Sequence, residues 1–266
     1  MQETTFSHKI LPGLNRKVFR LGLCANFGIE PEAYEAALER GFNYLYWVSW
    51  RTGRLRAPLK RALKADRERY VVATGPVLGY FGGSVRRAAE STLRTLGTDY
   101  LDVFHLFWLG KTSAWTESTQ SELIKLKEEG KIRTIGISIH DRKRANLLMK
   151  DSPIDLFMLR YNAAHPGAER DIFAHHDHAA PNRKAVVAYT ATSWRKLLKK
   201  PSAWEGAPMT AGDCYRFCLS NPHVDVALTG PANMKQLDEN FAAMEKGPLS
   251  SEEDDWMRRF GKVVHA

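Results

Sequence analysis

The chain has 266 residues, of which 44% are hydrophobic and 26% are charged, and its formal net charge is +9. These values are typical of a globular protein, and we expect residues 1–266 to form a single domain with a large core. No run of about 18 apolar residues occurs, so no membrane-spanning helix is predicted. Residues 1–20 lack the apolar stretch of a signal peptide, and we expect a cytoplasmic protein.

The basic residues indicate the possible partners of the chain, and the cysteines indicate its redox compartment. Lys and Arg are spread along the chain without a nucleic-acid-binding motif, so nucleic acid is not an expected partner. A phosphorylated cofactor or an acidic substrate stays open as the reason for the positive charge. Cys24, Cys214 and Cys218 are few and odd in number, and we interpret them as buried thiols in a reducing compartment.

Apolar runs rich in Val, Leu and aromatic residues recur along the whole chain. They lack strict polar alternation, which is typical of strands that are buried on both faces. The predicted strands are Phe19–Leu23, Asn43–Val48, Tyr70–Thr74, Leu101–Phe107, Thr134–Ile139, Leu156–Tyr161, Ala185–Tyr189 and Val224–Leu228.

Helical segments lie between these strands and are bounded by capping and stop residues. Pro31 and Gly41 enclose the first helix, Asp141 is a good N-cap, and Ser250 with Glu253 forms a capping box for the last helix. The predicted helices are Ala33–Arg40, Arg54–Ala65, Ser84–Leu96, Thr119–Glu129, Arg142–Lys150, Ala168–His176, Ala211–Leu219, Asn233–Lys246 and a terminal helix that ends at Phe260.

A strand and a helix repeated eight times predict a (β/α)₈ TIM barrel with short loops. An open doubly wound sheet is the alternative, but no GxGxxG motif follows the first strand. Turn signals within Leu11–Val18 predict a hairpin that caps the barrel floor. Reactive groups of such barrels project from the carboxyl ends of the strands, so we expect the site there.

Several motifs in this repeat resemble the aldo-keto reductase family. The run Arg94–Asp102 (RTLGTDYLD) is the most specific, and Gly130–Ser138 and Gln236–Asn240 follow it in the family's order. The resemblance covers residues 11–247 and implies a (β/α)₈ barrel that uses NADP(H). It also implies carbonyl reduction by an Asp, Tyr, Lys and His tetrad, in which the Lys–Asp pair lowers the pKa of the Tyr that donates the proton.

The resemblance places none of the tetrad residues in this chain. Its Asp position falls on Tyr46, its Lys on Gly75, its His on Phe107, and its Tyr near Trp50 or Arg51. Loss of the Asp and the Lys together avoids the cost of a buried unpaired charge. We therefore interpret the pattern as a remodelled pocket rather than a decayed one.

The chain retains only some of the cofactor-binding residues that the resemblance implies. Tyr189 would lie against the nicotinamide and Ser138 near its carboxamide, but Ile139 and Met158 replace the amide side chains of the family. A helix start favours phosphate, and Asn233 and its neighbours could equally serve only as caps and backbone supports. The implied nucleotide contacts are Gly230, Asn233, Lys235, Gln236, Glu239 and Asn240.

Candidates for proton transfer are Tyr46, His105 and His140. Each could instead be structural: Tyr46 as a core filler, His105 as a core histidine one layer below Phe107, and His140 as part of a helix start. Arg51 and Arg160 could bind a carboxylate, with surface ion pairs as the alternative. Flat aromatic walls for a ligand are expected from Trp47, Trp50, Phe107, Trp108 and Trp194.

Metal binding is not predicted, because His165, His175, His176 and His178 lack partners at ligand spacing. Three functions stay open. One is an enzyme that acts on a small organic molecule by isomerisation, elimination, hydrolysis or cyclisation. Another is an NADPH-dependent reductase with Tyr46 or His105 as its acid, and the third is a non-catalytic NADP(H)-binding or sensing protein. The chain is short after the eighth strand, which predicts an open site or one closed by a partner subunit in a homo-oligomer.

Overall fold

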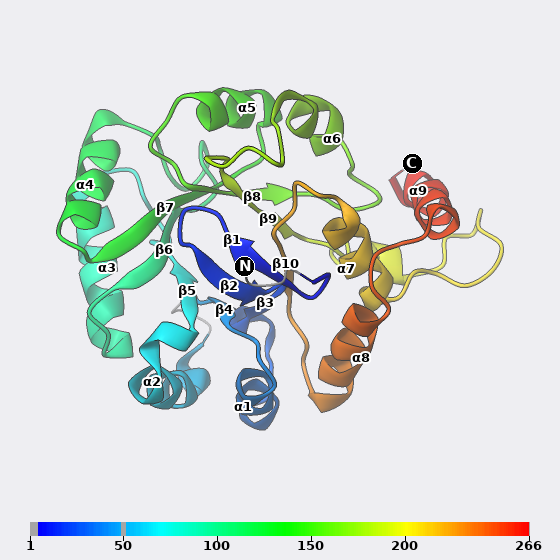
Figure 1. Cartoon of the computed structure of the whole chain (residues 1–266), viewed down its shortest axis with the longest axis horizontal. Helices are drawn as coiled ribbons and strands as arrows, with labels where there is room; N and C mark the ends of the chain where they lie inside the picture. The colour runs from blue at the N-terminus through cyan, green and yellow to red at the C-terminus, as the bar shows by residue number, and fades with distance from the viewer. Residues whose placement is uncertain (1–4, 49–51, 266) are drawn as a thin grey trace.

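The computed structural model describes residues 5–48 and 52–265, and these form a closed eight-stranded parallel barrel surrounded by helices (Figure 1). The strands follow one another around the barrel in chain order, which confirms the (β/α)₈ prediction. Their bounds are β3 Leu21–Cys24, β4 Tyr44–Tyr46, β5 Val71–Thr74, β6 Leu101–Leu106, β7 Ile132–Ile139, β8 Leu156–Arg160, β9 Ala185–Tyr189 and β10 Val226–Thr229.

The helices largely follow the predicted segments, and the Asp141 N-cap and the Ser250–Glu253 capping box are confirmed. The single helix predicted over Ala168–His176 is wrong, because the backbone leaves the helical region at Ile172 (φ −131°, ψ −64°). The α-helices are α1 Pro31–Glu39, α2 Arg56–Ala65, α3 Gly82–Leu96, α4 Glu117–Glu128, α5 Arg142–Lys150, α6 Ala168–Asp171, α7 Ala211–Ser220, α8 Met234–Glu245 and α9 Ser251–His265; the 3₁₀ turns are η1 Ala25–Phe27, η3 Gly53–Leu55, η4 Arg67–Arg69, η5 Phe173–His175 and η6 Lys196–Leu198.

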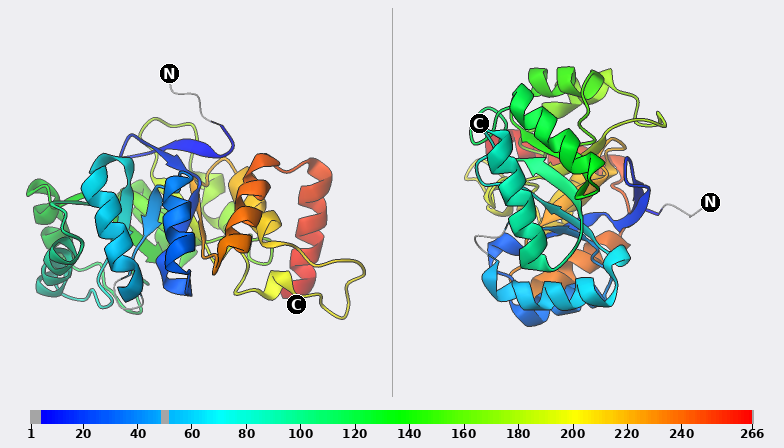
Figure 2. Two further views of the ribbon diagram at one scale, coloured as in Figure 1. Left: turned by 90° about the horizontal axis from the view of Figure 1, so that it is seen from below. Right: turned by 90° about the vertical axis from the view of Figure 1, so that its left-hand side faces the viewer.

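An antiparallel hairpin covers one end of the barrel, as predicted, and is longer than expected. It consists of β1 (His8–Leu11) and β2 (Arg16–Phe19), so Phe19 belongs to the hairpin and the first barrel strand begins at Leu21. Leu11 and Val18 of the hairpin are fully buried against the barrel interior. This end is the barrel floor, and Figure 2 shows the hairpin and the N-terminus together on it.

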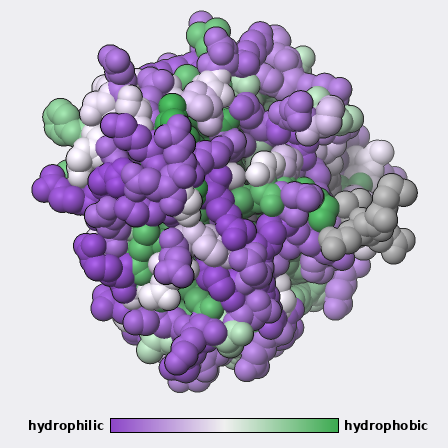
Figure 3. All heavy atoms as spheres, turned by 60° about the vertical axis from the view of Figure 1, so that its left-hand side comes forward, coloured by the Kyte–Doolittle hydropathy of each residue, from purple (hydrophilic) through white to green (hydrophobic). Residues whose placement is uncertain are grey.

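Two apolar layers hold the barrel together. Side chains that point inward, such as Tyr44 and Val103, fill its interior, and their neighbours along the strands, such as Leu45 and Phe104, pack against the helices. All three cysteines are buried and free, as predicted. Figure 3 shows that hydrophilic side chains dominate the outer face around α3 and α4. In the described part of the chain, no helix combines the length and the apolar character needed to cross a bilayer.

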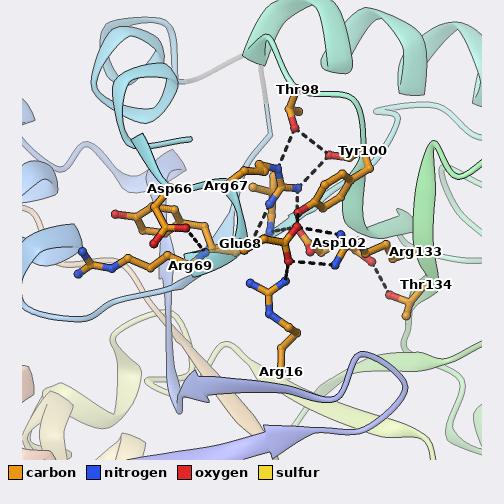
Figure 4. A network of polar contacts seen from close by, with 12 residues as sticks. Arg16, Asp66, Arg67, Glu68, Arg69, Thr98, Tyr100, Asp102, Arg133 and Thr134 are labelled. Atoms are coloured by element: carbon orange, nitrogen blue, oxygen red, sulfur yellow. Dashed lines mark hydrogen bonds and ion pairs between the residues drawn. The ribbon is translucent and has the colours of Figure 1, made fainter. Parts of the chain in front are cut away.

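The Arg94–Asp102 motif has a structural role at the floor (Figure 4). The fully buried Asp102 carboxylate accepts hydrogen bonds from Arg67 Nη2 at 2.7 Å and from the Val72 N–H at 2.9 Å. Tyr100 donates to Glu68, whose carboxylate also pairs with Arg16 of the hairpin and with Arg133. These contacts join β6, β5, β7 and the hairpin, which positions the strands that end at the mouth.

Candidate functional site

The carboxyl ends of the strands form the barrel mouth, and aromatic rings fill its centre. Tyr46, Phe107 and Tyr189 pack partly buried on top of the interior layer. The Tyr46 and Phe107 ring centroids are 5.6 Å apart in an edge-to-face arrangement. Burial and the neighbouring Cys24 raise the pKa of the Tyr46 hydroxyl, so it is protonated at neutral pH and is a weak acid.

Gly75 follows β5 at the point where the family resemblance places a lysine. A Cβ added here would overlap the carbonyl oxygen of His105 and lie 3.0 Å from the Phe107 ring. The overlapped atom belongs to the backbone of β6, which cannot move away as a flexible side chain could. The close approach of the two strands therefore favours glycine and leaves no space for a longer residue.

His105 lies beneath Phe107 and does not reach the mouth. It is 0% exposed and stacks on the Phe107 ring with centroids 5.3 Å apart. Neither ring nitrogen has a hydrogen-bond partner within residues 5–48 and 52–265. Burial lowers the pKa of His105 to about 3, so its ring is neutral. The expectation that it lies one layer below Phe107 is confirmed, but its proposed role as an acid toward a substrate does not agree with this burial.

A second group of side chains lies at the rim, at the ends of β6, β7, β8 and β9. The Tyr189 hydroxyl is 3.1 Å from His140 Nε2, and the His140 and Trp108 rings are 5.8 Å apart. Arg160, at the end of β8, lies with its guanidinium carbon 5.9 Å from the centre of the Trp194 ring. We call these residues the rim cluster: Trp108, His140, Arg160, Tyr189 and Trp194.

The rim cluster combines a base, a weak acid and a cation. Burial and the Arg160 charge lower the pKa of His140 below its ordinary value, which favours the neutral, basic ring at pH 7. Burial raises the pKa of Tyr189 to about 12, with Arg160 opposing this shift. A neutral imidazole beside a phenol and a guanidinium can remove a proton and stabilise the negative charge that results.

Unusual backbone conformations hold both exposed tryptophans of the rim cluster. Trp108 and Trp194 have φ values of 50° and 52°, and Thr190, Ser193 and Arg195 in the same segment as Trp194 also have positive φ values. Bulky residues rarely adopt this conformation, and such strain is concentrated at functional sites. Trp108 and Trp194 are 49% and 60% exposed, so they present flat apolar surface to solvent at the mouth.

Not all predicted substrate contacts lie at the mouth. Trp47 is 1% exposed and packs between the barrel and the helices, because it has the same strand parity as the outward-facing Leu45. The prediction that Trp47 forms part of an aromatic wall for the ligand is therefore wrong. Trp50 and Arg51 lie outside the described residues. Phe27 was missed by the sequence reasoning; it is 68% exposed and lies against Gly230, where an added Cβ would be 2.7 Å from its ring.

The start of α8 could hold phosphate groups. Asn233 caps the helix by accepting from the Gln236 N–H, and the Gln236 side chain accepts from the Ala232 N–H. Lys235 is exposed in the first turn, where it adds a positive charge to that of the helix dipole. Of the other implied contacts, Glu239 is exposed and Asn240 is buried, where it donates to Thr229 Oγ1 at 3.0 Å. The nucleotide end of an NADP(H) molecule therefore fits this part of the chain, with Asn240 in a supporting role.

The nicotinamide end fits less well. Ser138 Oγ accepts from the Trp108 N–H at 2.6 Å, so it is already engaged, and the Tyr189 hydroxyl faces His140. Ile139 and Met158 are 2% and 3% exposed and supply no amide group for a carboxamide. Among the described residues no group of three or more His, Cys, Asp or Glu side chains is arranged to hold a metal ion.

The barrel and the position of its mouth define a (β/α)₈ protein with a candidate site at the carboxyl ends of its strands. Residues 31–208, more than half of the chain, match the model of the aldo/keto reductase family. The chain therefore belongs to the aldo/keto reductase family.

Solved structures and a curated relative agree with this membership. The barrel is similar to an aldo-keto reductase from Klebsiella pneumoniae in complex with NADPH (23% identity, TM-score 0.78, 98% of this chain and 96% of that one). It is also similar to the holo form of AKR11C1 from Bacillus halodurans (21% identity, TM-score 0.77, 97% of both chains). At these identities the likeness establishes the fold. An NADH-specific methylglyoxal reductase of Escherichia coli is 28% identical over 91 residues, which are 34% of this chain and 28% of that protein.

Proposed function

We propose that this protein is an aldo/keto reductase family member with a remodelled site, which transfers a proton on a small organic anion without hydride transfer. The observation that carries the proposal is the packing at Gly75, which leaves no space for the cation of the family's proton relay. The rim cluster supplies a different set of acid–base groups at the same end of the barrel.

The rim cluster suggests how such a reaction proceeds. Arg160 binds the carboxylate or carbonyl oxygen of the substrate, and Trp108 and Trp194 cover its apolar part. Neutral His140 removes a proton from the adjacent carbon, and the electron pair of that C–H bond forms an enolate that Arg160 and the Tyr189 hydroxyl stabilise. Return of the proton to another carbon gives isomerisation, and departure of a leaving group gives elimination. Tyr46, protonated and packed against Phe107 at the centre of the mouth, adds a neutral group to this end of the barrel.

Solvent deuterium exchange tests the proposal without knowledge of the substrate. Pools of 2-oxo acids and hydroxy acids are incubated with the protein in D₂O, without nicotinamide cofactor, and are followed by proton NMR. We expect exchange next to a carbonyl or carboxylate group in at least one compound, and a rate lower by about 10²–10⁴-fold in His140→Gln. His178→Gln, an exposed histidine of the floor, is the matched control. Exchange that is equally fast in His140→Gln would refute the role of His140.

The pH profile of this exchange gives a further prediction. The neutral form of His140 is the active base, so the rate falls as the pH drops through its pKa, which lies below 6.5. Arg160 is one cause of the low pKa; Arg160→Gln therefore shifts the acid limb to higher pH and also weakens substrate binding. The profile is measured with a compound that exchanges in the wild-type protein. A limb that moves to lower pH in Arg160→Gln contradicts the assignment.

A second candidate function is NADPH-dependent carbonyl reduction, which the α8 start and the NADPH-bound structural relative favour. It predicts that NADPH quenches the fluorescence of Trp108 and Trp194 and is oxidised in the presence of an aldehyde such as methylglyoxal. Lys235→Gln should weaken NADPH binding about tenfold and leave NADH binding unchanged, because only NADPH carries the 2′-phosphate. Binding without oxidation would instead favour a nucleotide-binding or sensing protein.

A further inference from the structure

A cavity of about 420 Å³ lies at the floor, at the opposite end of the barrel from the mouth. It is formed by the end of α5, the segment between α6 and β9, and His223 before β10. Lys9 of the hairpin contacts the Pro222 carbonyl and Asp225 beside it, which places the cavity next to the hairpin. Figure 2 shows the segment between α6 and β9 at the hairpin end. Cavities of this size typically hold small organic molecules.

The inner wall of the cavity is apolar and partly flat. Met149, Ile172, Phe173 and Val186 line it and are each less than 10% exposed. The Phe173 ring stacks on His223 with centroids 4.9 Å apart and an interplanar angle of 4°. This wall suits the flat apolar body of a ligand.

The rest of the lining carries more cationic than anionic side chains. Lys150, Arg183 and Lys184 line the cavity, and Asp177 is the carboxylate among its described lining residues. Arg183 pairs with the buried Asp225 at 2.8 Å, but Asp225 also pairs with Lys9 at 3.0 Å. One carboxylate is thus shared by two cations, and positive charge is left over at this end of the barrel.

His223 has an acceptor at each of its ring nitrogens. Nε2 is 2.9 Å from the His176 carbonyl oxygen, and Nδ1 is 3.3 Å from Asn221 Oδ1. The Asn221 amide is oriented by its Nδ2, which donates to the Tyr161 hydroxyl. Asn221 Oδ1 also accepts from the His223 backbone N–H at 3.1 Å. Burial lowers the pKa of His223, and the positive charges of His178, Arg183 and Lys9 act in the same direction, so the neutral ring can donate from Nε2 to the His176 carbonyl. A negative charge in the cavity would complement the cationic side chains that line it, Lys150, Arg183 and Lys184.

We propose that the floor cavity binds a small organic anion, a carboxylate on a flat apolar group, between the cationic side chains and the Phe173–His223 stack. This site is separate from the rim cluster, and it does not depend on the reaction that occurs at the mouth. None of its residues is part of the proposed proton-transfer machinery.

Titrations of the ¹⁵N-labelled protein with benzoate and with benzamide, its neutral isostere, test this proposal by NMR. We expect benzoate to shift the backbone amides of residues 176–184 and of His223 in a saturable way. Benzamide should bind at least about tenfold more weakly, because it lacks the charge. The proposal is overturned if the shifts concentrate at Trp108, His140 and Tyr189, if the two probes bind equally, or if neither probe gives a saturable shift.

Variants then separate the cavity from general charge effects. Lys184→Met keeps the aliphatic stem, His223→Phe keeps the flat ring, and each should weaken benzoate binding about tenfold. Lys200→Gln removes the same charge from an exposed lysine of the β9–α7 segment and should leave binding unchanged. Equal weakening in Lys200→Gln, or full benzoate binding in both cavity variants, contradicts the site. If a variant does not fold, the benzoate and benzamide titrations of the wild-type protein still test the proposal.

Discussion

Gly75→Ala is expected to lower the free energy of unfolding by about 3 kcal/mol, although it adds a single methyl group. The new Cβ would overlap the His105 carbonyl oxygen and approach the Phe107 ring at 3.0 Å. Relief requires β5 and β6 to move apart, and these strands are joined by backbone hydrogen bonds. Urea unfolding followed by circular dichroism measures the effect as a lower midpoint at an unchanged slope.

Gly83→Ala is the matched control for this prediction. Gly83 lies in the first turn of α3, and an added methyl group there meets open space among the described residues. Alanine should therefore be neutral or stabilise by up to about 1 kcal/mol. Equal stability of Gly75→Ala and the wild-type protein would show that β5 and β6 separate easily, and the packing argument for a remodelled site would then fail.

The same packing predicts the effect of restoring the Asp–Lys ion pair that the family resemblance implies. In the double variant Tyr46→Asp/Gly75→Lys the lysine meets the overlap that already destabilises alanine. We expect a protein that is less stable than Gly75→Ala and does not oxidise NADPH in the presence of an aldehyde. A folded double variant with restored reduction would instead indicate that the family's relay needs only those two side chains.

The fold followed from the sequence because its signals are local and repeated. Apolar runs and caps such as Asp141 and Ser250 each act within one element, and eight repeats leave few topologies. The helix break at Ile172 was missed because the segment has a helical pattern, whereas Ile172 is fully buried and Phe173 stacks on His223, a residue far away in the sequence. Trp47 was misplaced because the sequence alone did not reveal which strand parity faces the barrel interior.

The site was only partly predictable for a different reason. Gly75, Phe107 and His105 were recognised individually, but the close approach of β5 to β6 is a property of the backbone. The rim cluster joins residues from four separate strand ends, and no spacing in the sequence links His140 to Tyr189 or Arg160 to Trp194. The floor cavity was missed because His176 and His178 were considered only as possible metal ligands, a role that depends on spacing, and His223 was not considered as a site residue.

Asp102→Asn is expected to destabilise the protein by about 3 kcal/mol. Its carboxylate is fully buried and is the partner of Arg67, whose side chain is 15% exposed, and it also accepts from the Val72 N–H. Asparagine keeps the shape but leaves the Arg67 charge without its counter-ion in a poorly hydrated place. The loss is measured by urea unfolding of the variant and of Asp99→Asn, an exposed residue of the same motif that should change stability by less than about 0.5 kcal/mol.

A double-mutant cycle with Arg67→Gln separates the contribution of the Asp102–Arg67 ion pair to stability from that of the other Asp102 and Arg67 contacts. If the ion pair is the main source of the stability, the losses of the two single variants add up to more than the loss of the double variant. We expect a coupling free energy of about 2 kcal/mol. Additive losses would assign the stability to the Val72 and Tyr100 contacts instead. A strong coupling also explains why the most recognisable run of this chain ends at Asp102 on the floor: the motif holds β5 against β6, and the position of Gly75 at the mouth depends on that register.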